Sequence, residues 1–208
     1  MKIMFSGRPH AQMRSIDTSK AEACPGVEAV FTAADVPVNE YGLLNADQPA
    51  LVGIGSRKTG ADVARFVGDQ VALVVAETED EAAAGCELIA VDWLSLPVLT
   101  DPHEAMKSDA PVLLPARDTN IAKYNRVRKG DVQAVWDQCV ATAEGTYETP
   151  RQEHAYLQPE AGIAYMDAEG RVTVAVAGQW AHEEQRQIAH VLGIPLEKVR
   201  VIHPAIGG

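Results

Sequence analysis

The chain has 208 residues, of which 47% are hydrophobic, so it can bury a sizeable core in one large or two small domains. Its formal net charge of -11 at pH 7 argues against a nucleic-acid-binding protein, because contacts to phosphates need clustered lysine and arginine. No apolar run approaches the roughly 20 residues that span a bilayer, and the N-terminus lacks the apolar core of a secretory signal. We therefore expect a cytoplasmic protein without a membrane partner.

The three cysteines lie far apart in the chain and form no CxxC pair. They are Cys24, Cys86 and Cys139. This spacing predicts neither a structural zinc site nor an iron–sulfur cluster within the chain. We expect free and mostly buried thiols.

The first third of the chain combines strand signals with long loops. Residues 1–36 predict a strand, a short helix and a second strand, with Ser19 and Glu22 as the capping box of the helix. Residues 37–64 are rich in proline, glycine, asparagine and aspartate. They predict long loops around a short strand at 49–54.

The next segment is more regular. The apolar run at 71–76 has the length of a strand and predicts burial on both faces. Thr78 and Glu81 form a second capping box, which opens a helix through about Ile89. Residues 91–99 predict a further strand.

Residues 101–130 lack the regular hydrophobic pattern of the preceding segment. They contain several prolines and show no sustained helical or strand period. They predict an extended linker that wraps over a surface. A helix capped by Asp131 follows, and residues 143–150 resemble a strand.

The last part again shows regular elements. Residues 161–178 predict a hairpin with its turn at 167–170. Residues 180–192 predict an amphipathic helix that ends at Gly193, and residues 198–204 a last strand. Helices and strands thus mix along the chain, which indicates an α+β fold.

Two familiar motifs fail on inspection. In GIGSRKTGA (53–61), Lys58 occupies the third glycine position of the dinucleotide fingerprint, and the phosphate-loop pattern is also broken. In HEEQR (182–186), Arg186 stands where a zinc protease needs its second histidine. A flexible loop and a solvated helix face are the expectations for these two segments.

The stretch RQEHAYLQPE (151–160) is harder to interpret. Gln152 is neutral and carries donors and an acceptor, so it can contact an oxygen without adding charge. Tyr156 and Leu157 are typical packing anchors, and His154 is typical of a packing histidine. From the residues alone, a well-bonded structural loop is favoured over a binding site.

Four segments, in order, resemble the xanthine dehydrogenase and aldehyde oxidase family of molybdenum hydroxylases. They begin with FSGRPHAQ, VGDQVALVVAETEDEAAAGCELIAVDWL, VRKGDVQAVWDQC and GQWAHEEQRQIAHVLGIPLEKVRVIHPAIGG. The third runs on through the QEH-x-Y-L stretch. The resemblance implies an α/β-hammerhead domain at 1–105, an extended linker at 106–130, and the truncated N-terminal portion of a molybdopterin-binding domain at 131–208.

The resemblance also implies roles for four residues. Gln152 matches the glutamine that lies near the molybdenum, and Gln179 a position that contacts the pterin. Gly207 and Gly208 match the first glycines of the cofactor-binding loop, where the backbone approaches the cofactor closely. In the family the catalytic glutamate and most of the cofactor cage come later in the sequence. We therefore expect no molybdopterin on this chain alone, and no protein ligand to a metal.

The implied activity is hydroxylation of a purine-like heterocycle or an aldehyde with oxygen from water. Iron–sulfur and FAD domains or subunits would accept the electrons, and this chain would carry neither group. The implied partners are these domains, the remainder of the molybdopterin-binding subunit and a small-molecule substrate. The alternative is a non-catalytic assembly module that is inactive by itself. We expect a fragment or one piece of a split subunit, with an exposed apolar face that promotes self-association.

Overall fold

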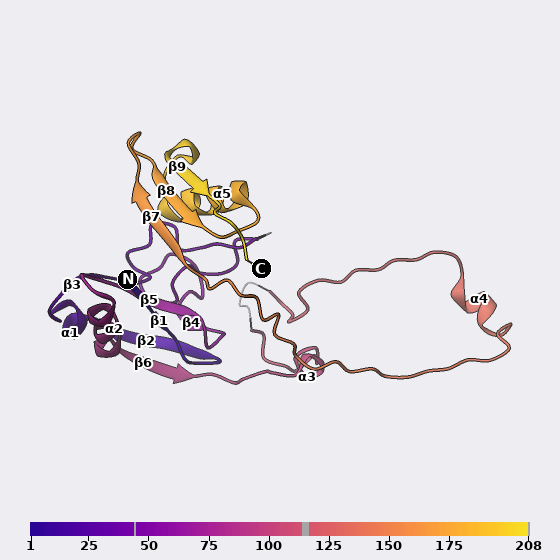
Figure 1. Cartoon of the computed structure of the whole chain (residues 1–208). Helices are drawn as coiled ribbons and strands as arrows, with labels where there is room; N and C mark the ends of the chain where they lie inside the picture. The colour runs from indigo at the N-terminus through magenta and orange to yellow at the C-terminus, as the bar shows by residue number, and fades with distance from the viewer. Residues whose placement is uncertain (44, 114–116, 208) are drawn as a thin grey trace.

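The computed structural model describes residues 1–43, 45–113 and 117–207 (Figure 1). Its strands form three sheets of three strands each. The first two sheets belong to the first hundred residues, and the third belongs to the last fifty. A long arm that carries the short helix α4 (Val132–Trp136) runs out between these two parts (Figure 1). The α+β architecture is confirmed.

The first sheet has the order β1-β5-β3, and both pairings are antiparallel. Its strands are β1 (Lys2–Phe5), β5 (Gln70–Ala76) and β3 (Val27–Phe31). Val71, Ala72 and Val74 of the central strand are fully buried. The predicted strand with two buried faces is therefore confirmed, because Val71 points to one face of the sheet and Ala72 and Val74 to the other.

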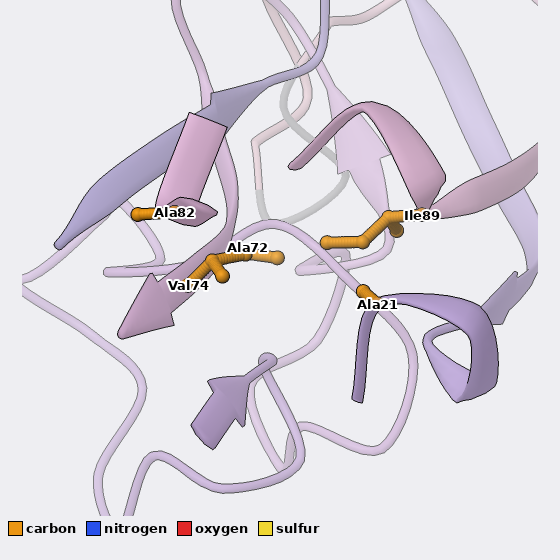
Figure 2. Close-up of a cluster of buried hydrophobic side chains, with 5 residues drawn as sticks. All are labelled: Ala21, Ala72, Val74, Ala82 and Ile89. Carbon is orange, nitrogen blue, oxygen red and sulfur yellow. The ribbon is translucent and has the colours of Figure 1, made fainter. Parts of the chain in front are cut away.

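Two helices cover this sheet, α1 (Ser19–Glu22) and α2 (Glu79–Leu88). Figure 2 shows the side chains gathered between the helices and β5, namely Ala21, Ala72, Val74, Ala82 and Ile89. They are small or branched, so the elements approach one another closely.

The second sheet has the order β4-β2-β6, with β4 (Val63–Ala64), β2 (Ala11–Asp17) and β6 (Ala90–Ser95).

The two predicted capping boxes have different outcomes. At α2 the box is formed: Glu81 N–H donates to Thr78 Oγ1 at 3.3 Å, and Thr78 N–H donates to Glu81 Oε2 at 3.0 Å. At α1 the prediction is wrong, because Ser19 is already helical and Thr18 is the N-cap. Glu22 instead accepts a hydrogen bond from the Thr18 hydroxyl at 2.6 Å.

The predicted strand at 49–54 is also wrong, although its centre is buried. Leu51 and Val52 lie in the core without belonging to a strand. The side chain of Asn39 replaces a partner strand: its Nδ2 donates to the Leu51 carbonyl at 2.7 Å, and its Oδ1 accepts from Leu51 N–H at 2.9 Å. A buried amide thus satisfies the backbone that a ladder would otherwise satisfy.

The third sheet has the order β7-β8-β9. β7 (Gly162–Met166) and β8 (Val172–Val176) form the predicted hairpin, and β9 (Val199–Ile202) pairs with β8 in parallel. The crossover between β8 and β9 contains α5 (Ala181–Leu192) and a short 3-10 turn (Leu196–Lys198). α5 ends at Gly193, as predicted, and the φ of +64° at this residue is left-handed.

The hairpin turn is organised by Asp167. Its carboxylate accepts N–H bonds from Glu169 (3.1 Å) and Arg171 (2.9 Å), the Thr173 hydroxyl (3.0 Å), and the Arg171 guanidinium (2.8 Å). The Arg171 backbone N–H, followed by its guanidinium and the Thr173 hydroxyl, lowers the pKa of Asp167 from 3.8 to about 2. The charged form is therefore the one that the turn stabilises.

Asp167→Asn is expected to weaken the hairpin near neutral pH and to leave it unchanged in strong acid. Because the pKa is lower in the folded state, the contribution of Asp167 is full above about pH 4 and is lost as the pH falls towards about 2. Amide hydrogen exchange of β8 under urea, compared between wild type and variant at the two extremes, measures this. Asp118→Asn in the exposed linker is the control, and an identical loss of protection at both pH extremes would contradict the prediction.

The arm is less regular than the sequence suggests. Asp131 caps α4 by accepting from Ala134 N–H at 3.2 Å, as predicted, but the helix ends before Cys139. Residues 143–150 are exposed and form no strand, so that prediction is wrong. Cys139 is exposed as well, whereas Cys24 and Cys86 are partly buried. The short helix α3 (Pro102–Ala105) lies just before residue 106, where the linker begins.

The two folded parts meet where a loop of the first part contacts the end of α5. Val38 N–H donates to the Val191 carbonyl at 3.1 Å. Glu40 lies 3.1 Å from His190 Nε2 and 3.3 Å from Lys58 Nζ. The hydrogen bond from His190, together with Lys58, holds the pKa of Glu40 below its ordinary value.

In the described ranges, no helix is long and apolar enough to cross a membrane.

Candidate cofactor site

The candidate site lies where two parallel strands end. The chain leaves β8 through Gly178, Gln179 and Trp180 and enters α5. The chain leaving β9 runs through His203 to Gly207. Because β8 and β9 are parallel neighbours, both exits lie at the same edge of the sheet, which is where ligands bind in open sheets of this kind.

A carboxylate–imidazole pair joins these two exits. Glu184 Oε2 of α5 lies 2.6 Å from His203 Nε2, and both side chains are mostly shielded from solvent. Gly178 makes room for the pair, because a Cβ at this position would overlap the Glu184 carboxylate. The expected solvated face at 182–186 is therefore wrong for Glu184, although Arg186 is exposed and pairs with Glu183.

The exit after β9 contacts the stretch that follows Gln152. Gln158 Oε1 accepts a hydrogen bond from Gly207 N–H. A Cβ at Gly207 would lie 3.0 Å from the Gln158 Cβ, so only glycine allows this approach without displacement. Gly207 and six residues between His154 and Glu160 line an open cavity of about 600 Å3.

Gln152 itself lies outside this cavity. Its side chain is exposed, and its Nε2 donates to the carbonyl of Glu153 at 3.3 Å. Glu153 folds back and accepts from the backbone N–H of His154 at 3.1 Å. Ala155, which follows, has a φ of +53° and turns the chain. The described residues thus do not bring Gln152 to Gln179 or Gly207.

The other predicted site residues have mixed outcomes. Gln179 is exposed at the exit of β8, and Gly207 lies at the exit of β9. Gly208 lies outside the described residues. Tyr156 and Leu157 are 50% and 94% exposed, so the prediction that they anchor the loop by packing is wrong.

Sequence reasoning missed Gln158, Glu184 and His203. Gln158 is the second amide of the QEH-x-Y-L-Q stretch. The presence of this second glutamine is the sequence feature that could have pointed to it. Glu184 and His203 are 19 residues apart, and only the crossover from β8 to β9 brings them together. Their pairing could not be predicted from local spacing.

Comparison with known proteins assigns both parts of the chain. Residues 1–97 match the family described as "Aldehyde oxidase and xanthine dehydrogenase, a/b hammerhead domain", and residues 114–208 match "Molybdopterin cofactor-binding domain". The chain belongs to the xanthine dehydrogenase and aldehyde oxidase family of molybdenum hydroxylases. The hammerhead fold and the start of the molybdopterin-binding domain are thereby confirmed.

Individual relatives of this chain belong to the same family. A probable xanthine dehydrogenase subunit from Bacillus subtilis is 37% identical over 208 residues, which is all of this chain and 27% of that protein. The nicotinate dehydrogenase large molybdopterin subunit from Eubacterium barkeri is 36% identical over 99% of this chain and 46% of that protein. The chain therefore spans between about a quarter and a half of these relatives.

A solved structure supports the same fold. The aldehyde oxidoreductase from Desulfovibrio gigas superimposes with a TM-score of 0.87 at 26% identity. The match covers all of this chain and 23% of that one. The arm, the hammerhead sheets and the β7-β8-β9 sheet therefore all belong to a known arrangement.

The candidate site is compatible with a pterin. Gln158 and Gln179 can donate and accept, and the backbone at Gly207 has a face without a side chain. A pterin ring carries both donors and acceptors along its edges, which neutral amides match. The described residues contain no group of three or more histidine, cysteine or acidic side chains that could hold a metal ion.

Proposed function

We propose that this chain contributes the hammerhead domain and the first part of the molybdopterin-binding domain to a molybdenum hydroxylase. The enzyme would oxidise a purine-like heterocycle or an aldehyde with oxygen from water. The observation that carries this proposal is the order of the two matches, 1–97 and 114–208, which together account for all but a short linker. Relatives named as xanthine and nicotinate dehydrogenase subunits support the substrate class.

The residues of the candidate site would bind and position the cofactor. Gly207 offers its backbone, and Gln158 fixes the course of that backbone through the hydrogen bond to Gly207 N–H. Gln179 would contact the pterin from the exit of β8. The molybdenum cofactor supplies the redox and oxygen-transfer chemistry. We further propose that Gln152 approaches the substrate oxygen near the molybdenum and hydrogen-bonds to it without adding charge.

The arm supports a role within a larger subunit. Its large apolar side chains are exposed, notably Val127, Tyr147 and Leu157 at 92% or more. Exposure of this extent on an extended segment is typical of a surface that another domain covers. We propose that the remainder of the molybdopterin-binding subunit covers the arm and thereby carries Gln152 to the site. Iron–sulfur and FAD domains or subunits would accept the electrons.

One observation favours the alternative of a non-catalytic assembly module. The described residues leave Gln152 outside the cavity that Gly207 lines, and its side chain bonds to the neighbouring Glu153 carbonyl. A chain in this state would dock and position other domains without performing the oxidation.

Labelled water distinguishes the two functions. The full-length protein with its electron-transfer partners, incubated with heterocycles in H2(18)O, is expected to place one labelled oxygen in the product. Unlabelled product would contradict the hydroxylase proposal. Absence of product from a protein that contains the cofactor would support the assembly module.

A further inference from the structure

A second cavity lies on the hammerhead domain, where the linker returns to the ends of β2 and β6. It has a volume of about 280 Å3. Its walls come from Arg65, from residues before β2 and after β6, and from residue 113 and residues 117–122 of the linker. Neither family match assigns a role to this cavity, and it shares no residue with the candidate cofactor site.

Two guanidinium groups line this cavity. Arg65 Nε donates to the Leu113 carbonyl at 2.8 Å, and Arg65 Nη1 donates to the carbonyls of Gly60 and Val63. Arg117 Nη1 donates to the Ala122 carbonyl at 3.0 Å. Both side chains are partly buried, so they are fixed in place rather than free in solvent.

Neither guanidinium has a carboxylate partner within 4.0 Å in the described part of the chain. Asp62 and Asp69 are the acidic groups near Arg65. Asp62 instead accepts from the Gln12 side chain at 2.8 Å, and Asp69 accepts from the backbone N–H of Arg65 at 2.6 Å. The chain has 29 acidic and 18 basic residues, and two guanidinium groups nevertheless line one cavity without a direct ion pair in the described residues.

Two of the other polar side chains of the cavity, Asn120 and His10, already make hydrogen bonds, and Thr119 Oγ1 accepts from Ile121 N–H at 3.2 Å. Asn120 accepts from Leu113 N–H at 2.8 Å and donates to the carbonyls of Ala105 and Pro111. His10 Nδ1 lies 2.5 Å from the Pro97 carbonyl, and since a carbonyl only accepts, Nδ1 carries the proton. The remaining N–H groups of the two guanidiniums, together with the Thr119 hydroxyl, are thus available as donors.

The rest of the lining is apolar, including Val98, Leu99 and Leu113. Burial already lowers the pKa of the Arg65 guanidinium, so an anion beside it would relieve an unfavourable environment. A planar fork of N–H groups matches the two oxygens of a carboxylate. The apolar walls would contact the body of the same ligand.

We propose that this cavity binds a small monocarboxylate with an aromatic or branched apolar body. The carboxylate pairs with Arg117 and Arg65, and the apolar body lies against Val98 and Leu99. Binding would fix the linker on the hammerhead domain, because Arg117 and Leu113 belong to the linker. The inference does not depend on the proposed hydroxylase activity.

Ligand-observed fluorine NMR of 4-fluorobenzoate tests the proposal on the full-length protein, with or without molybdenum. We expect saturable binding with a Kd of about 1 mM or below, and none for the neutral 4-fluorobenzamide. Arg117→Gln is expected to weaken binding about tenfold, because a charge-assisted pair is lost. Arg14→Gln, an exposed arginine of β2, is the matched control and should leave binding unchanged.

Three results would overturn the proposal. They are no saturable binding, equal binding of the benzamide, and unchanged binding in Arg117→Gln. The last result would also identify 4-fluorobenzoate bound at a substrate site elsewhere. Arg117 is the primary variant because Arg65 also holds Gly60 and Val63, so its replacement could disturb the fold.

Discussion

Gly85→Leu is expected to destabilise the hammerhead domain by about 3 kcal/mol, because the core has no room for a side chain at this position. Gly85 is buried in α2 and faces the first sheet. A Cβ at Gly85 would already lie 2.8 Å from Val74 Cγ1 and 3.1 Å from Val27 Cγ2. Val74 is fully buried at the centre of the core, so it cannot move aside without displacing β5.

Urea unfolding followed through the amide protons of β5 measures this effect. Ala84→Leu is the matched control, since Ala84 is the preceding residue of the same helix and its side chain is exposed. It should change the free energy of unfolding by no more than about 0.5 kcal/mol. Equal midpoints for the two variants would show that α2 does not pack on β5 as described.

Gln152→Ala is expected to lower the turnover of the complete enzyme about 100-fold while leaving its molybdenum content unchanged. The reason is the loss of one positioned hydrogen bond near the reacting oxygen. Because Gln152 is exposed and, among the described residues, its side chain bonds to the neighbouring Glu153 alone, the substitution should not affect folding. The measurement is kcat at saturating substrate together with the metal content of each preparation.

Gln133→Ala is the control for the arm, as Gln133 is an exposed glutamine of α4. Its turnover should equal that of wild type. Turnover of Gln152→Ala at the wild-type level would remove the role proposed for this amide. Reduced turnover with proportionally reduced molybdenum would instead assign Gln152 to cofactor retention.

Local chemistry could be predicted well from the sequence. The Thr78–Glu81 capping box, the Asp131 cap and the left-handed Gly193 each depend on neighbours within a few residues. The hairpin at 162–176 could be predicted for the same reason, since its turn residue Asp167 bonds only to residues up to six positions away.

Features that depend on distant partners could not be predicted. Leu51 and Val52 have the composition of a strand, yet the Asn39 side chain takes the place of the neighbouring strand. Residues 143–150 have strand-forming side chains but lie on an arm that offers no adjacent strand. Strand propensity becomes a strand only where a partner is present.

The candidate site likewise combines features that the sequence predicts with a contact that depends on a distant partner. The family resemblance predicts roles for the glycine at 207 and the amide at 179, and the parallel pairing of β8 and β9 explains why both lie at one edge. The contact between Gln158 and Gly207 spans 49 residues. It depends on how the end of the arm returns to the sheet, which no local pattern encodes.

The most direct test of the central claim is the molybdenum and pterin content of the purified full-length protein. Production in a host that makes the molybdenum cofactor is expected to give roughly equimolar molybdenum and pterin. A paired Gly207→Val variant should lose both while keeping the exchange protection of β5, since its side chain would crowd Gln158 in the candidate cofactor site. A folded wild-type protein that contains neither molybdenum nor pterin would contradict the account.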